Sequence, residues 1–96
     1  MRWSICMHEY ARRDKNRLVL GADPSQRLKL KIEIDAAIRS VADDPNKRGT
    51  AFSVDGFQRI IDQGRIRLFI DVNLRNVANP EDDRTCWILG VMTVES

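Results

Sequence analysis

One stretch of the sequence, residues 64–72, alternates apolar side chains with polar or aromatic ones. A period of two is typical of a β-strand with one buried and one open face, because successive side chains point to opposite sides of a sheet. The apolar positions are Ile66, Leu68, Ile70 and Val72, and the others are Arg65, Arg67, Phe69 and Asp71. Residues 65–72 should therefore form a strand of a sheet that is covered on one face.

Three other runs in the C-terminal half have the residue types of strands, namely residues 51–55, 57–62 and 85–94. Residues 62–64 have the composition of a tight turn, because Gly64 adopts positive φ without strain. The runs on either side of this turn should pair as an antiparallel hairpin. Residues 79–83 predict a further turn, so this half is expected to form a meander of three or four strands.

The N-terminal end of the chain predicts one more strand and then a helix. Residues 2–8 alternate, with Trp3, Ile5 and Met7 on the apolar side, as in a half-buried strand. The strongly charged segment from residue 9 to residue 20 predicts a short first helix, which ends before a glycine.

A longer helix is predicted over residues 24–42. Asp23 can accept hydrogen bonds from the free N–H groups of a first turn, and Pro24 fits the first helical position. Asp43-Asp44-Pro45 provides the stop. Apolar residues also alternate over residues 28–34, so a strand is the alternative for that part.

The composition is that of a folded protein. Apolar residues make up 43% of the sequence and charged residues 31%, a balance that excludes disordered and membrane-spanning classes. The first residues lack the apolar run of a secretory signal, so a cytoplasmic location is expected. With 96 residues, the chain can form one hydrophobic core. We therefore expect a single α+β domain over residues 1–96, with the long helix packed on one face of the meander.

Neither a metal site nor a cofactor is predicted. Cys6 and Cys86 are far apart in the sequence, and His8 is the single histidine, so the spacing of a zinc site is missing. A glycine-rich nucleotide-binding loop is also missing. His8 as a general base is a minor hypothesis, because it has no partner in the sequence pattern.

Arg59, Arg65, Arg67 and Phe69 are the candidate binding residues. Two guanidinium groups about 7 Å apart on one strand, beside an aromatic ring, are suited to grip phosphates and to stack on a base. Twelve of the sixteen basic residues are arginines, the side chain that favours phosphate recognition. The alternative is an ordinary solvated sheet face on which Asp71 pairs with Arg67.

The order of these elements, and several short motifs within them, resemble the RelE/ParE superfamily of toxins. The motifs are Asp44-Pro45, Gly49, residues 57–61, the Gly-x-x-Arg-hydrophobic-aromatic pattern of residues 64–69, and the terminal strand 86–91. The resemblance implies a toxin of a type II toxin–antitoxin system, with a cognate antitoxin or another protein as its partner. In ribonuclease members of that superfamily, basic residues of the central sheet hold RNA phosphates and stabilise charge during cleavage of mRNA on the ribosome. The matching positions here are Arg59, Arg65 and Arg67, which the resemblance makes candidate catalytic residues.

The resemblance also leaves alternatives open. Some members act on DNA gyrase and do not use the nuclease residues. The ribonucleases usually continue past the last strand with basic and aromatic residues, whereas this sequence ends at Ser96, which favours a non-catalytic binding module as the second hypothesis. A third hypothesis is an apolar surface that another chain completes, because Leu28 and Ile32 lie on the opposite side of the predicted helix from its core face.

Overall fold

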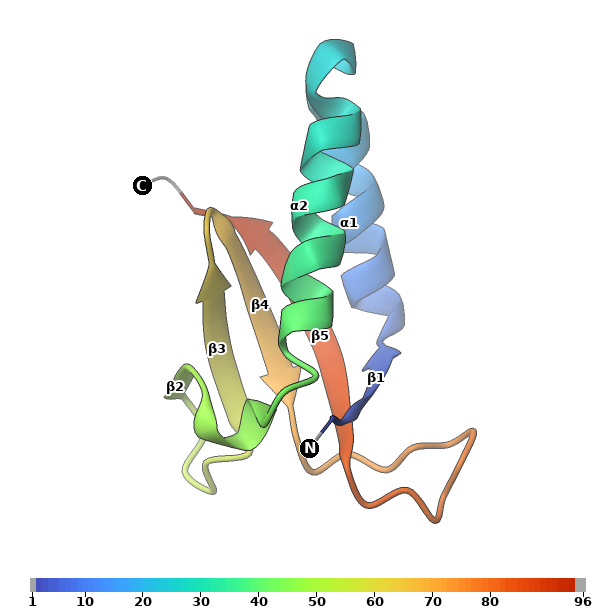
Figure 1. The fold of residues 1–96 in the computed structure, drawn as a ribbon, viewed down its shortest axis with the longest axis vertical. Coiled ribbons are helices and arrows are strands. Elements are labelled where there is room, and N and C mark those ends of the chain that lie inside the picture. Colours follow the sequence, from blue (N-terminus) through green and yellow to red (C-terminus); the bar gives the residue numbers. More distant parts are fainter. Residues whose placement is uncertain (1, 95–96) are drawn as a thin grey trace.

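The structure is a computed structural model that describes residues 2–94, in which two helices lie against one face of a five-stranded sheet (Figure 1). The strands are β1 (Ser4–Met7), β2 (Thr50–Ala51), β3 (Gln58–Gln63), β4 (Ile66–Asp71) and β5 (Thr85–Thr93). The helices are α1 (Glu9–Gly21) and α2 (Arg27–Ser40), with short 3-10 helices at η1 (Pro24–Gln26) and η2 (Pro45–Lys47). The predicted α+β class, with an N-terminal strand and two helices before the other strands, is confirmed.

The sheet has the order β1-β5-β4-β3-β2. The three pairings among strands β2 to β5 are antiparallel, as the predicted meander requires, and the predicted hairpin is formed by β3 and β4. Strand β1 pairs in parallel with β5, so the sheet is mixed. This pairing places the first and last strands of the chain side by side.

The predicted strand over residues 51–55 is wrong beyond its first residue. Strand β2 ends at Ala51, and the following residues form a turn in which Gly56 has φ +78°. The Asp55 carboxylate accepts a hydrogen bond from the Phe57 N–H at 2.9 Å, and the Ser53 hydroxyl accepts one from the Gln58 N–H at 3.0 Å. These side chains bond to backbone N–H groups next to the strand. Ser and Asp side chains commonly compete with the hydrogen bonds of a sheet in this way.

The predicted helix is confirmed over residues 28–34, and the strand alternative is wrong. In α2, Leu30, Ile34 and Ala37 are buried on one face, and Leu28 and Ile32 are exposed, whereas a strand would have placed Leu28, Leu30, Ile32 and Ile34 all on one face. The predicted capping by Asp23 is wrong in detail, because its side chain forms no capping bond among the described residues and η1 precedes the α-helix. Helix α1 begins as predicted and ends at Gly21.

The core lies between α2, α1 and the sheet. The buried apolar side chains of β4 are those of Ile66, Leu68 and Ile70, so the predicted alternation is confirmed over residues 66–70. Asp71, which was predicted on the other face, is also buried. The three apolar side chains pack with the buried residues of α2 and with Ile88 and Val91 of β5 in one cluster. The sheet therefore has a helix-covered face and an open face.

Helix α1 also completes the edge of β5. Strand β1 pairs with β5 only as far as Ile88, so the outer edge of β5 beyond that residue has no strand partner among the described residues. There the Asp14 carboxylate of α1 accepts a hydrogen bond from the Val91 N–H at 3.1 Å. A side chain thus satisfies a backbone donor that would otherwise lack a partner in the sheet.

We expect Gly49 and Gly56 to differ sharply in their tolerance of alanine. Both have positive φ, +67° and +78°, but a Cβ at Gly49 would lie 2.0 Å from the Ile60 carbonyl oxygen, whereas a Cβ at Gly56 would meet no atom within 4 Å among the described residues. Gly56→Ala should cost about 1–2 kcal/mol of unfolding free energy from backbone strain alone. Gly49→Ala should cost more than about 4 kcal/mol, because backbone must also move. Urea unfolding followed by circular dichroism measures both, and equal losses would contradict the close approach of Gly49 to strand β3.

Candidate functional site

Arg65 lies in the turn between β3 and β4, one residue before the strand that was predicted to contain it. Its guanidinium donates to the Glu33 carboxylate of α2, with Nε 2.6 Å from Oε2 and Nη2 3.3 Å from Oε1. The side chain therefore reaches towards the helical layer. Hydrogen bonding to Arg65 lowers the pKa of Glu33, so this carboxylate stays ionised.

Arg67 lies on the open face of the sheet, as predicted. It is directly opposite Asp62 of β3, and its Nε and Nη2 donate to the two carboxylate oxygens at 2.8 and 3.0 Å. This hydrogen bonding lowers the pKa of Asp62 and raises the pKa of Arg67. The alternative pairing of Arg67 with Asp71 is wrong, because Asp71 is buried and accepts from the Asn73 N–H at 2.8 Å.

Arg59 lies on the other face. Its strand partner is Ile70, and paired residues of an antiparallel ladder share a face, so Arg59 points to the helix-covered side. Beyond the end of α2 its guanidinium donates to the carbonyl oxygens of Arg48 at 2.7 Å and of Gly49 and Gly56 at 3.3 Å. It fixes the segments on both sides of β2. The three predicted arginines thus occupy three separate places, and the structure does not bring them together.

Phe69 lies on the open face beside Arg67, as predicted. Its ring packs edge-on against Phe52, with ring centroids 6.2 Å apart, and its strand partner on β5 is Gly90. Ile60, opposite Phe69 on β3, and the exposed Met92 of β5 belong to the same face. This part of the sheet is therefore mainly apolar, with one ion pair. Sequence reasoning missed Phe52, because it follows a strand that is shorter than its residue types suggest.

His8 serves as the N-cap of α1. Its Nδ1 accepts a hydrogen bond from the Tyr10 N–H at 3.2 Å, and its ring is 6.4 Å from that of Trp87. An imidazole nitrogen that accepts from the backbone at a helix start has a structural use there. The minor hypothesis of a general base gains no support from this geometry.

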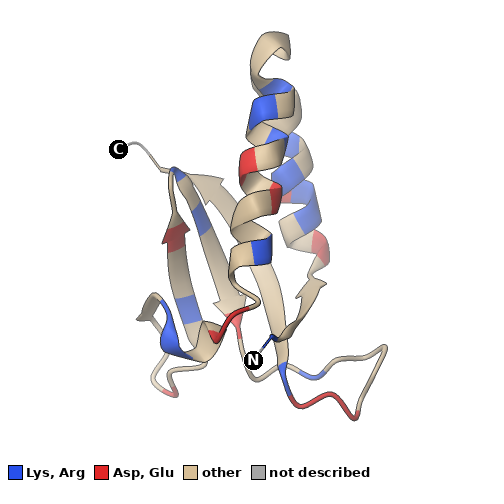
Figure 2. Ribbon diagram, viewed as in Figure 1, with Lys and Arg blue, Asp and Glu red and all other residues tan. Residues whose placement is uncertain are grey.

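The basic side chains are concentrated on the helices. Eight of the sixteen lysines and arginines lie on α1 and α2 (Figure 2). A groove of about 550 Å³ runs beside α1, and it was not predicted from the sequence. It is lined by Met7, Arg12, Lys15, Asn16, Val19, Leu20 and Lys31. The signal that could have found it is the recurrence of lining residues at positions 12, 15, 16, 19 and 20, which is the spacing of one helix face.

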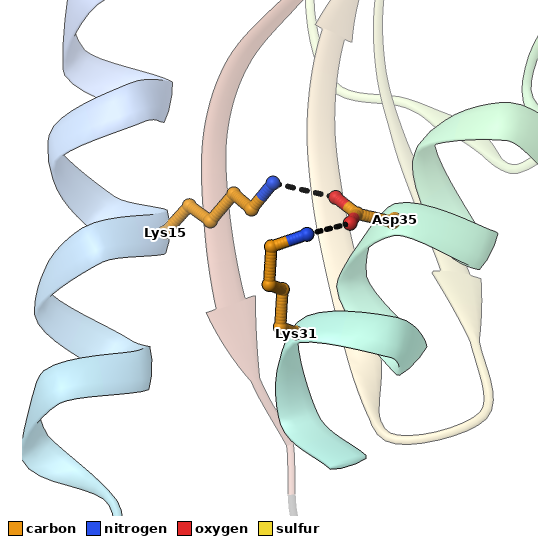
Figure 3. A network of polar contacts seen from close by, with 3 residues as sticks. All are labelled: Lys15, Lys31 and Asp35. Carbon is orange, nitrogen blue, oxygen red and sulfur yellow. Dashed lines mark hydrogen bonds and ion pairs between the residues drawn. The ribbon is translucent and has the colours of Figure 1, made fainter. Parts of the chain in front are cut away.

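Two lysines of this groove share one carboxylate. Asp35 of α2 accepts from Lys15 of α1 at 2.5 Å and from Lys31, one turn earlier on α2, at 2.9 Å (Figure 3). Hydrogen bonds from Lys15 and then Lys31 lower the pKa of Asp35. The ion pair with Lys15 bridges the two helices (Figure 3).

Two limits on the chemistry come from the described residues. Within residues 2–94, no group of three or more His, Cys, Asp or Glu side chains is placed to hold a metal ion. None of the helices in that range is both long and apolar enough to cross a membrane.

Solved structures establish the fold type. No family model and no curated protein matches the sequence. A chain of the toxin–antitoxin complex RelBE2 from Mycobacterium tuberculosis is similar with a TM-score of 0.63 and 17% identity, over 97% of this chain and 99% of that one. A chain of the chromosomal ParDE TA system from P. aeruginosa is similar with a TM-score of 0.64 and 15% identity, over 98% of both. The RelE/ParE-like fold expected from the sequence is confirmed.

We expect Asp35→Asn to lower the free energy of unfolding by about 1 kcal/mol near neutral pH, the size of a partly exposed ion pair. Because the folded-state pKa of Asp35 is lowered, this contribution is present above the unfolded pKa of about 3.9 and is lost as the pH falls through the folded-state value. Urea midpoints of both proteins, measured from neutral to strongly acidic pH, should converge at the acidic end. The exposed Asp23→Asn controls for the loss of one charge, and a gap that persists in strong acid would contradict the assignment.

Proposed function

We propose that this chain is the toxin component of a type II toxin–antitoxin system, that it acts in the cytoplasm, and that its partner is a cognate antitoxin. The observation that carries the proposal is the fold, which is shared over nearly the whole chain with chains of two toxin–antitoxin structures. The order of the elements and the hairpin motif at residues 64–69 support it from the sequence.

The arrangement of the arginines favours a toxin that acts by binding a macromolecular target, such as gyrase. A ribonuclease site built on Arg59, Arg65 and Arg67 requires convergent guanidinium groups to stabilise the transition-state charge. Here Arg59 is fixed to carbonyl oxygens on the helix-covered side, and Arg65 and Arg67 are paired with carboxylates of different elements. Catalysis by these three residues would require at least two side chains to change partners and one to change face.

Cleavage of mRNA is the second candidate, and one observation favours it. The side chains of Arg65 and Arg67 are 45% and 35% exposed, and exposed ion pairs contribute little to stability. A phosphate can therefore replace either carboxylate at small cost. Phe69 beside Arg67 offers an aromatic edge for contact with a base.

Induced expression of the chain in a bacterial host tests the proposal. Growth should stop, and the readouts that follow identify the target: broken mRNA on ribosomes for a ribonuclease, or altered plasmid supercoiling for action on gyrase. Gly49→Ala, which is expected to be strongly destabilised, is the control for the burden of expression. Unimpaired growth of several hosts that contain well-folded protein would overturn the toxin assignment.

A pair of variants tests whether Arg67 contacts RNA. Asp62→Asn should strengthen binding of single-stranded RNA, because it releases the Arg67 guanidinium, and Arg67→Ala should reduce the slope of log affinity against log salt by about one. Fluorescence anisotropy at several salt concentrations measures both effects. Arg39→Ala, at an exposed site of α2, is the matched control. If both variants bind as the wild-type chain does, Arg67 has no place in an RNA site.

A further inference from the structure

The long connection between β4 and β5, residues 72–84, is fixed in place by hydrogen bonds. Trp87 Nε1 of β5 donates to a carbonyl oxygen of this loop at 3.1 Å, and the Ser4 hydroxyl donates to the Asp82 carboxylate at 2.5 Å. The buried Asn76 accepts two backbone N–H groups of the loop, at 3.1 and 3.0 Å. Figure 1 shows the loop extending past β5 to the side of β1. A connection this long without a helix or strand is commonly functional.

A cavity of about 500 Å³ lies between this loop, β1, α1 and β5. Three consecutive residues of β1 line it, and β1 is the edge strand of the sheet, so the cavity is at the sheet edge. Its size and its mainly apolar lining are those of pockets that hold small ligands. The lining residues are Ile5, Cys6, Met7, Arg12, Asn76, Val77, Ala78 and Trp87.

Trp87 gives the cavity an aromatic wall. It is the strand partner of Cys6, so both side chains lie on the face of the sheet that the loop covers. The Trp87 ring is held by its Nε1 hydrogen bond and lies 6.4 Å from the ring of His8. Burial, and then the nearby Asp82 carboxylate, raise the pKa of the Cys6 thiol, so the thiol stays neutral. This side of the cavity is therefore aromatic and uncharged.

Arg12 provides the one formal charge among the described lining residues. It takes part in no ion pair within residues 2–94. The N–H groups of Ser4 and His8 donate towards β5, both at 2.9 Å. Since successive N–H groups of a strand point to opposite edges, those of Ile5 and Met7 point to the outer edge. A guanidinium beside backbone N–H groups is suited to bind a carboxylate or a phosphate.

We propose that this cavity binds a small aromatic anion, a molecule with one planar ring system and one carboxylate or phosphate group. The ring lies against Trp87 and Val77, and the anionic group is held by Arg12 and the free N–H groups of β1. Aromatic ring pairs add to the burial of apolar area when they stack offset or edge-on. The proposal is independent of the toxin assignment, because the cavity contains none of the three predicted arginines.

The test titrates the full chain, labelled with ¹⁵N, with indoleacetate and with adenosine monophosphate. The indole N–H of Trp87 and the amides of Cys6, Met7 and Val77 should shift, with dissociation constants of about 1 mM or less. The indole N–H of Trp3, which packs against the core, should not shift and is the internal control. Neutral indoleacetamide should bind about ten-fold more weakly than indoleacetate, because it lacks the charge that Arg12 binds. The tighter of the two anions identifies the group as carboxylate or phosphate.

A variant assigns the charge to Arg12. Arg12→Ala should weaken both anions about ten-fold and leave the affinity for indoleacetamide unchanged, which separates a lost charge from a damaged cavity. Arg12 is exposed, so the variant should fold. Arg13→Ala makes the same change at the next exposed position of α1, outside the lining residues, and it should bind as the wild-type chain does.

Three results would overturn the proposal: no saturable shifts at millimolar concentrations, equal affinity for indoleacetamide and indoleacetate, or undiminished anion binding by Arg12→Ala. A short single-stranded RNA that shifts the same signals at lower concentration than adenosine monophosphate would also overturn it, because the cavity would then belong to a nucleic-acid site. None of these readouts is growth arrest. The ligand site can therefore fail while the toxin assignment stands, and the toxin assignment can fail while the ligand site stands.

Discussion

The structure depends on strand β5, which holds the two ends of the described chain together. It pairs with β4 on one side and with β1 on the other, so that Ser4 lies opposite Thr85. Closing contacts between such distant residues costs chain entropy, which is recovered only when the core residues between helices and sheet pack together. Where β1 ends, the Asp14 carboxylate takes over at the edge of β5. Sheet closure and helix docking are therefore parts of one cooperative arrangement.

That arrangement determines where the charges are available. On the open sheet face Arg67 is balanced by Asp62, and at the hairpin turn Arg65 is balanced by Glu33. On the outer side of the helices, two lysines share one carboxylate and Arg12 lies nearby. The near-neutral net charge of +2 thus includes arginines of the hairpin that are paired with carboxylates and an Arg12 that forms no ion pair within residues 2–94.

The sequence predicted the fold well where one physical signal dominated. Alternation over residues 64–72 located β4 and its buried face, because no other periodicity competes there, and the buried face of α2 followed from helical spacing once the helix was chosen. It failed at β2, where backbone hydrogen bonds that the side chains of Ser53 and Asp55 accept outweigh strand propensity. The parallel partner of β1 was also beyond reach, since pairing between distant strands leaves no local pattern.

The candidate site was less predictable, and the reason is register. A shift of one residue moves a side chain to the opposite face of a sheet. Grouping Arg59 with Arg67 assumed a pairing that would place both on one face, whereas the observed register sets Arg59 opposite the buried Ile70. The side chain of Arg65 was set by a carboxylate on α2, far away in sequence. Residue types and spacing thus identified the arginines but could not determine their directions.

The same geometry separates the two surfaces of the molecule. Glu33 and Asp35 are two residues apart on α2, so their side chains leave the helix about 200° apart. One reaches the β3–β4 turn through Arg65, and the other reaches α1 through Lys15. Ion pairs therefore connect helix α2 to the β3–β4 turn on one side and to helix α1 on the other.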